Sequence, residues 1–265
     1  MGDAWGSALT CQELAAVTSA GFAPVGQVFG AAVYAAGSAS VSGCPGRGDP
    51  GTFAPVVEAM YQARRAAIDR MTAECAALGG HGVVGVRLSQ GRFFLGGLEF
   101  TAIGTAVRAA GVADRPRAPF TSDVSGQDFA RLIGAGWVPA GLALGVAIGA
   151  RHDDQATKRQ ARLWSGNAEM AGWTELVNQS RQHARRRLEE DVRRLGADGV
   201  VIAGMPMRVR QRDCPVATGR RDHIVEVTLI GTAIAGFSPA SHRRTRPALA
   251  VMPVGPRHRQ AAGAW

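Results

Sequence analysis

The sequence predicts an α+β protein that contains two copies of one small domain, each with a short N-terminal helix and a long helix packed on a small antiparallel sheet. Three observations support this fold class. Three sequence blocks occur twice in the same order, each copy has one long segment with an apolar stripe at helical spacing, and each copy ends in strands rich in β-branched residues. A period of about 115 to 125 residues is too long for a solenoid and indicates tandem domains.

The first repeated block predicts a short helix followed by a strand. Residues 7–34 align without a gap on residues 122–149, with nine of 28 positions identical. A serine or threonine precedes each helix as an N-cap candidate, namely Ser7 or Thr10 in the first copy and Ser125 in the second. Each following strand has two glycines four residues apart, at Gly26 and Gly30 and at Gly141 and Gly145. We expect these glycines to let a helix or another backbone approach closely.

The second repeated block predicts a long amphipathic helix in each copy. Apolar or small residues recur every three or four positions, with Met60, Arg64, Ala67, Met71, Cys75 and Leu78 on one stripe and Val177, Ala184, Leu188, Val192 and Leu195 on the other. A glycine follows each helix, at Gly79 and Gly196, as expected for a helix C-terminus. Each helix should therefore cover one face of a sheet.

The third repeated block predicts the last strand of each copy. Residues 98–107 match residues 225–234 at six of ten positions. Gly104 and Gly231 stand in the middle of these strands, where glycine needs a local reason. The reason we expect is close approach of the long helix, at Ala67 in the first copy and at Ala184 in the second.

The chain is thus expected to contain a first repeat at 7–108, a second repeat at 120–236 and a basic tail at 237–265. The tail holds five arginines and no acidic residue, lacks periodicity and is expected to be disordered. Loops at 35–52 and 150–166 separate the first strand of each copy from its long helix.

Composition favours a folded bacterial protein of the cytoplasm. Apolar residues make up 46% of the chain, and 29 of its 30 basic residues are arginine, a bias typical of a GC-rich genome. The four cysteines form no C-x-x-C pair, and no basic n-region precedes an apolar stretch, so neither a disulfide scaffold nor a signal peptide is expected. Residues 132–150 are uncharged, but five glycines and a proline there fit a strand better than a membrane span.

The motifs together resemble the YbjQ-like family, whose members are labelled heavy-metal-binding domains. The resemblance rests on Ala63-Arg64-Arg65-Ala66-Ala67, on the segment from Leu78 to Val86, and on Gly104-Thr105-Ala106-Val107, with matching segments at 195–201 and 226–234. It implies a two-layer α+β fold and self-association, because single-domain members resemble ring-forming pentamers. It implies no established biochemical function. The duplication departs from the simple members, since whole two-repeat chains cannot fill a ring of five.

Metal ligands of the Cys, His and Asp types are few and scattered in this sequence. The candidates are Cys75, His81, His152, Asp153 and Asp154, with His223 near Cys214 as a further pair. Cys75 lies on an apolar helix stripe, which favours a buried structural thiol. His81 aligns with Asp198, so the two copies share no ligand. A metal ion therefore remains the one cofactor hypothesis, without an assigned site.

No catalytic residue is predicted, because the chain has no paired carboxylates, P-loop or nucleophile elbow. Thr105 and Thr232 lie inside strands without a partner histidine. Nucleic-acid binding is not expected either, because Arg185, Arg186 and Arg187 each have an acidic residue four positions later. We expect a non-enzymatic, self-assembling or ligand-binding module that forms a homo-oligomer. The alternatives are a metal-ion-binding protein, or binding of an anionic polymer through the arginine-rich tail.

Overall fold

The computed structural model describes residues 6–35, 53–92, 97–112, 118–160, 167, 169–214 and 218–237. The predicted tail, except for Phe237, and most of the loop at 35–52 lie outside these residues. The first repeat contains α1 (Cys11–Ser19), β1 (Phe22–Ala35), α2 (Ala54–Ala77), β2 (Gly82–Arg92) and β3 (Gly97–Ala109). The second contains α3 (Gly126–Gly134), β5 (Trp137–His152), α4 (Gln155–Gln160), α5 (Ala171–Arg194), β6 (Gly199–Gly204), β7 (Met207–Asp213) and β8 (Arg221–Gly236). The α+β fold with a duplicated domain is therefore confirmed.

The two sheets have the same core topology. In the first sheet β3 lies between β1 and β2, and in the second β8 lies between β5 and the β6–β7 pair, all antiparallel. A short strand from the linker, β4 (Phe120–Thr121), adds to β2 in parallel, so the first sheet is not purely antiparallel. The helix α4 in the second repeat was also not predicted.

The short helices begin where the repeat alignment placed their caps. Thr10 is the N-cap of α1 and forms a capping box with Glu13, and Ser125 caps α3 by accepting from the backbone N–H of Asp128. Ser7, the other candidate, lies outside the helix and contacts the Thr105 hydroxyl at 3.1 Å. Gly21 and Gly136 follow the helices with φ values of +85° and +82°, the left-handed conformation of a helix end.

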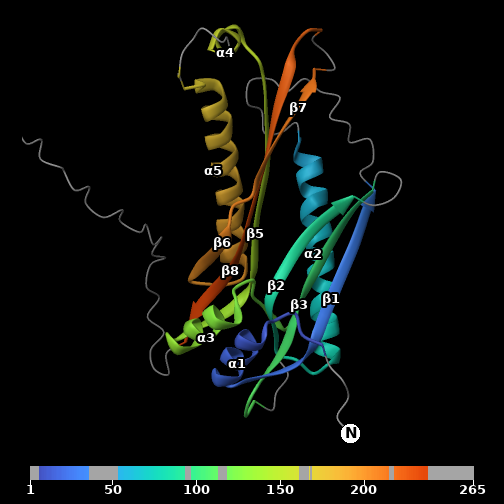
Figure 1. The fold of residues 1–265 in the computed structure, drawn as a ribbon, viewed down its shortest axis with the longest axis vertical. Coiled ribbons are helices and arrows are strands. Elements are labelled where there is room, and N and C mark those ends of the chain that lie inside the picture. The colour runs from blue at the N-terminus through green and yellow to red at the C-terminus, as the bar shows by residue number, and fades with distance from the viewer. Residues whose placement is uncertain are drawn as a thin grey trace, which may run out of the picture.

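Helix α2 lies between the two sheets, whereas α5 covers the far side of the second sheet (Figure 1). Val57, Met60 and Tyr61 of α2 belong to one core cluster with Leu144 and Val146 of β5. The opposite face of the second sheet packs on α5 in a separate cluster that includes Leu176, Leu188 and Val227. The layers therefore run first sheet, α2, second sheet, α5. No helix in the described part of the chain has the length and apolar character to cross a membrane.

Close approach of the long helices occurs at Gly30 and Gly145, not at Gly104 and Gly231. A Cβ on Gly30 would collide with the backbone oxygen of Ala67, and one on Gly145 with that of Ala184. The prediction for the other glycine pair was wrong. A Cβ on Gly104 would lie 2.5 Å from Val83 Cγ1, and one on Gly231 would lie 2.6 Å from the Val201 oxygen. Those crowding atoms belong to the neighbouring strands β2 and β6, where both ladders shift register.

The two repeats also join through their short helices. Helices α1 and α3 pack on each other, and a third core cluster contains Val17 of α1, Phe129 of α3 and Val107 of β3. The ring of Phe120 from the linker stacks on Phe129 at a centroid distance of 5.9 Å. This end of the molecule fixes the repeats relative to each other by burying apolar surface from both.

Candidate functional site

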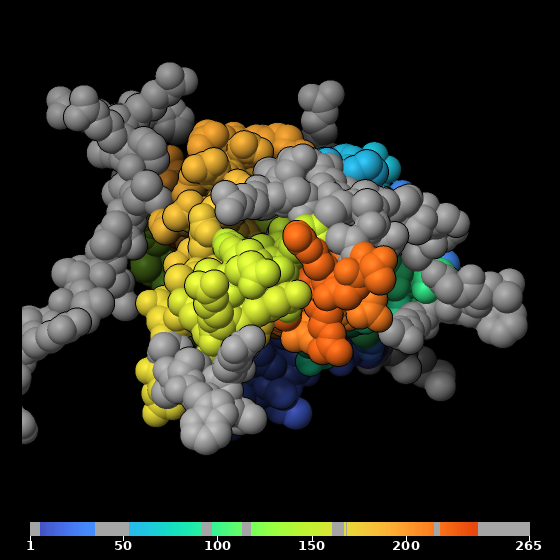
Figure 2. Space-filling model, turned by 90° about the horizontal axis from the view of Figure 1, so that it is seen from above, coloured from blue at the N-terminus to red at the C-terminus, as the bar shows by residue number. Residues whose placement is uncertain are grey.

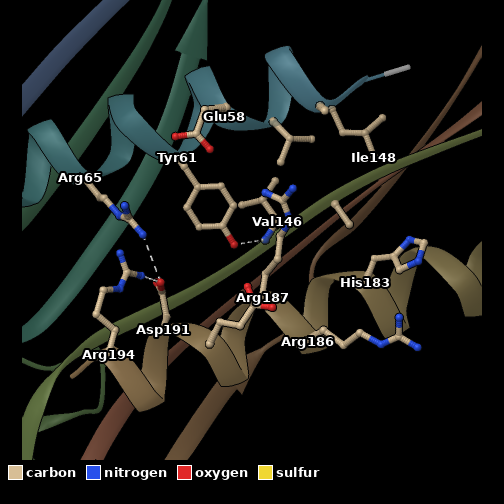
Figure 3. A pocket seen from close by; sticks show the side chains of 14 residues that line it. Glu58, Tyr61, Arg65, Val146, Ile148, His183, Arg186, Arg187, Asp191 and Arg194 are labelled. Atoms are coloured by element: carbon tan, nitrogen blue, oxygen red, sulfur yellow. Dashed lines mark hydrogen bonds and ion pairs between the residues drawn. The ribbon is translucent and has the colours of Figure 1, made fainter. Parts of the chain in front are cut away.

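A groove in the described part of the chain runs along β5, between α2 and α5 (Figure 3). It has a volume of about 710 Å³ and is open to solvent. Because β5 is an edge strand of the second sheet, its outer backbone groups need partners other than a neighbouring strand. Side chains of α2 and α5 that line the groove supply these hydrogen-bond partners.

Tyr61 of α2 closes part of the β5 edge with its hydroxyl. That hydroxyl donates a 2.9 Å hydrogen bond to the carbonyl of Leu144 and accepts one of 2.9 Å from the N–H of Val146. Burial raises the pKa of Tyr61, so the phenol keeps its proton as a donor. Tyr61 thus replaces the two backbone bonds that a further strand would make.

Asp191 of α5 completes the edge from the other side. Its carboxylate accepts a 3.0 Å hydrogen bond from the N–H of Leu144 and pairs with Arg65 of α2 at 3.2 Å. Arg194 also contacts this carboxylate, and Arg187 lies over the Tyr61 ring with its guanidinium carbon 5.5 Å from the centroid. The predicted pair of Arg185 with Glu189 is present, whereas Asp191 pairs with Arg65 and Arg194. These polar groups therefore hold α2, α5 and β5 together and have a structural role.

A second group of polar residues lies at the other end of the second sheet, beside α4. His152 is the last residue of β5, and it is paired in register with Asp222 at the start of β8. Asp222 is in turn paired with Arg212 near the end of β7. Residues directly opposite each other on neighbouring strands bring their side chains into contact. The sheet register therefore assembles a His–Asp–Arg row across three strands.

Cys214 joins this row from the segment that follows β7. Its sulfur lies 3.9 Å from Nε2 of His152, while Nδ1 of the same ring contacts the Asp222 carboxylate. Arg212 Nε donates to the other carboxylate oxygen at 3.1 Å. Asp222 is fully buried and Cys214 is 8% exposed. One ligand atom from each of His152, Cys214 and Asp222 lies within 4.8 Å of the others.

A parallel His–Asp pair flanks this cluster. His223 Nε2 lies 2.7 Å from an oxygen of Asp153, and the Trp173 ring packs on His223 at a centroid distance of 4.7 Å. Asp153 also donates its backbone N–H to the Arg221 carbonyl at 3.1 Å, which holds the end of β5 on β8. Figure 2 looks onto this end of the molecule, where α4 and the β7–β8 end lie side by side.

The structure separates the predicted metal candidates. Cys75 is buried under the first sheet, donates to the Gly82 carbonyl at 3.4 Å, and has a pKa raised to about 11 by burial. His81 is buried too, and its Nδ1 accepts from the Ala109 N–H at 3.2 Å. Cys75 and His81 therefore have structural roles, and each forms a hydrogen bond with a different backbone group.

Asp154 also has a local structural role. Its carboxylate accepts from the Thr157 N–H at 2.7 Å at the start of α4 and pairs with Arg151 at 2.8 Å. These bonds, led by that to the Thr157 backbone, hold the pKa of Asp154 well below its usual range. The Asp153 carboxylate contacts the His223 ring, as described above. Of the five candidates, only His152 belongs, among the described residues, to a group of three side chains close enough to share one metal ion.

Thr105 and Thr232 have equivalent anchoring roles in the two repeats. The Thr105 hydroxyl accepts from the Ala8 N–H at 2.9 Å, and that of Thr232 accepts from the Asp123 N–H at 2.9 Å. Each hydroxyl therefore ties down the segment that leads into the short helix of its repeat. Catalysis by these threonines is not assigned.

Asp222 and Arg212 were not found from the sequence. The available signal was the pairing of Arg151-His152-Asp153 at the end of one strand with Arg221-Asp222-His223 at the start of another. The sequence predicted a strand next to each of these segments, but only the register of the long β5–β8 ladder places His152 opposite Asp222. Cys214 lies after a separate strand, so no local pattern connects it with His152.

Comparison with known proteins gives the family. Residues 25–110 and residues 140–236 each match the model of the YbjQ family, described as "Putative heavy-metal-binding". The chain is also 36% identical over 239 residues to "Encapsulin nanocompartment protein Rv1762c" of Mycobacterium tuberculosis (strain ATCC 25618 / H37Rv), which covers 86% of this chain and 84% of that protein. The chain therefore belongs to the YbjQ-like family and carries two copies of its domain in tandem.

Proposed function

We propose that this protein is a non-enzymatic, self-assembling module of the cytoplasm, whose first sheet is covered by a second copy of the chain. The observation that carries the proposal is a difference between two equivalent residues. Leu144 on β5 is 1% exposed, because α2 covers that face of the second sheet. Phe29, its counterpart on β1, is 49% exposed.

A second pair of equivalent residues on this face shows the same difference. Phe29 pairs with Ile103 across the first sheet as Leu144 pairs with Ile230 across the second, so the two faces correspond in register. Val33 on the first sheet is 48% exposed, whereas its counterpart Ile148 packs against the α2 core cluster. The chain therefore covers one of its two equivalent sheet faces and leaves the other open. Exposed apolar faces of this kind mark interaction surfaces.

The second repeat of another copy is the natural occupant of this face. In the second sheet the covering element is a long helix from the other repeat, and α5 is the equivalent helix with an open outer side, which carries Arg181 and Arg185. Arginine stems cover apolar surface, and guanidinium groups stack on aromatic rings such as that of Phe29. A contact of α5 with the first sheet is head-to-tail, so repetition would give a ring or a filament.

The relative supports the same proposal. The name of the Mycobacterium tuberculosis protein associates it with an encapsulin nanocompartment, which is a protein assembly. A sequence identity of 36% over most of both chains supports a role in assembly for this protein. We assign no catalytic residue, and the hydroxyls of Thr105 and Thr232 are used as backbone anchors.

The test is the mass of the protein in solution, measured by light scattering after gel filtration over a range of concentrations. We expect the wild-type chain to exceed the 27.6 kDa of one chain. The double variant Phe29→Glu/Val33→Glu should shift to one chain, because charge on this face opposes burial. Val112→Glu, on a residue that is 51% exposed and follows β3 outside this face, is the matched control and should keep the wild-type mass.

Two results would overturn the proposal. One is a wild-type chain that remains a monomer at every concentration. The other is a double variant with the wild-type mass and an unchanged circular dichroism spectrum. Charge reversal at Arg181 tests the partner face, and it should weaken assembly without affecting thermal stability.

A further inference from the structure

We infer that Cys214 and His152, with Asp222 as the positioning residue, form a binding site for one thiophilic divalent cation per chain, at the end of the second repeat. The family description names heavy metals but gives no residues. The proposal is independent of self-assembly, because this cluster lies on the second repeat, whereas the open sheet face lies on the first.

The donor set suits such a cation. A thiolate and a neutral imidazole are the ligands that select zinc and softer metal ions over magnesium and calcium. Two donors on one tetrahedral zinc ion lie about 3.5 Å apart, given bond lengths near 2.3 Å to sulfur and 2.0 Å to nitrogen. Cys214 Sγ and His152 Nε2 are 3.9 Å apart, so a small side-chain adjustment brings both onto one ion.

Asp222 lies in the position from which a carboxylate can orient the His152 imidazole for metal binding. It contacts Nδ1 of His152, which leaves Nε2 directed toward the sulfur. Metal-binding histidines commonly donate their second ring N–H to a carboxylate, which fixes the tautomer and the ring orientation. Asp222 is itself fixed, because it is fully buried and receives a 3.1 Å hydrogen bond from Arg212.

The charges in the cluster also allow a divalent cation. Binding breaks the S–H bond of Cys214, the proton leaves to the buffer, and the sulfur bonds the cation. With a thiolate, the Asp222 carboxylate and the Arg212 guanidinium, the cluster then has a net charge of about −1 before the cation is counted. A 450 Å³ hollow at His152, lined also by Asp153 and Asp154, provides access from solvent.

The first repeat lacks counterparts of the residues that form this site. When the repeat offsets of 115 and 127 residues are continued, the counterpart of His152 is Gly37 and that of Asp222 is Leu95. Neither residue can bind a metal ion or orient an imidazole. The expected stoichiometry is therefore one cation per chain, although the fold is duplicated.

The experiment titrates the full chain, reduced and freed of metal by a chelator, with Cd²⁺ alone. The readout is the ultraviolet charge-transfer absorption of a cadmium–thiolate bond. We expect saturation at one equivalent, loss of the signal in Cys214→Ser, and retention in the matched controls Cys11→Ser and Cys44→Ser. Asp222→Asn should weaken binding by about 10- to 100-fold, as expected for removal of a carboxylate that supports a ligating histidine.

A histidine variant separates this site from binding by a thiol alone. His152→Gln keeps Cys214 but should lose at least tenfold in Cd²⁺ affinity, whereas His183→Gln, on α5 in the other groove, should bind as the wild type does. If Cys214→Ser does not fold, the zinc content of the two histidine variants after dialysis against Zn²⁺ provides a second readout. Undiminished absorption in Cys214→Ser, or equal affinity of the two histidine variants, would overturn the assignment.

Discussion

Asp191 accepts a 3.0 Å hydrogen bond from the backbone N–H of Leu144, which ties the outer helix α5 to the free edge of the second sheet. The first repeat makes the same bond with a different acid, since Glu74 of α2 accepts from the Phe29 N–H at 2.6 Å. Both acids stand in the last turn of their helices, three residues before the end. Both repeats therefore have a hydrogen bond from the edge strand to an acidic side chain of the long helix, although that side chain is aspartate in one repeat and glutamate in the other.

Asp191→Ala should lower the free energy of unfolding by about 1–3 kcal/mol, because the buried N–H of Leu144 loses its acceptor. Arg65 and Arg194 would also lose their partner, but both are half-exposed and can be solvated. Glu189→Ala is the control, because Glu189 makes only surface pairs with Arg185 and Arg193, typically worth about 0–1 kcal/mol. Urea denaturation measures both, and equal losses would contradict the assigned role of Asp191.

Gly145→Ala should destabilise the second repeat by about 1–3 kcal/mol, because the new methyl group would overlap the Ala184 carbonyl and push α5 off the sheet. Gly134→Ala, at the end of α3, is the matched control, since a Cβ there has no atom within 4 Å apart from its chain neighbours and the backbone of its own helix. Thermal unfolding of both variants is the measurement. A Gly145→Ala protein as stable as Gly134→Ala would show that the helix can move without cost.

Asp123→Asn should make stability less dependent on pH. The Thr232 hydroxyl donates to the Asp123 carboxylate at 2.5 Å, but burial dominates and raises the pKa of Asp123 above 3.8. Because the folded state then holds this proton more tightly than the unfolded state, the stabilisation is complete at low pH and is lost as pH rises through the folded pKa.

Asparagine does not titrate in this range, so the stability of Asp123→Asn relative to wild type should increase as pH rises from below 3.8 to neutrality. Denaturation at a series of pH values measures this difference. A difference that stays constant over that range would contradict the raised pKa.

Cys75 should resist alkylation in the folded protein, whereas the exposed Cys11 should react. Burial raises the pKa of Cys75 to about 11, so very little of it is thiolate at neutral pH, and its sulfur is also shielded. Iodoacetamide labelling followed by peptide mass spectrometry measures each site. Labelling of Cys75 at the rate of Cys11 before unfolding would contradict its burial, and urea should make the two rates similar.

The sequence determined the short helices, the long helices and the strands of the repeated blocks because that information is local, whereas β4, α4 and β7 were not predicted. Apolar spacing predicted α2 and α5, and cap candidates predicted the start of the short helices, at Ser125 in the second copy and at Ser7 or Thr10 in the first, of which the structure has Thr10. The close-approach role of Gly30 and Gly145 was also predictable, because glycine pairs on one strand face recur in both copies. The role of Gly104 was not predictable, because its crowding comes from a register shift in the adjacent strand β2.

Only the tertiary structure decided which face of each sheet is covered. An apolar stripe shows that a helix is buried but does not name its partner, so α2 could not be placed on both sheets from its pattern. The approach of Cys214 to His152 is equally non-local, because 62 residues separate them and the β5–β8 register determines their distance. Periodicity along one chain segment encodes burial, whereas contacts between segments depend on how whole layers stack and align.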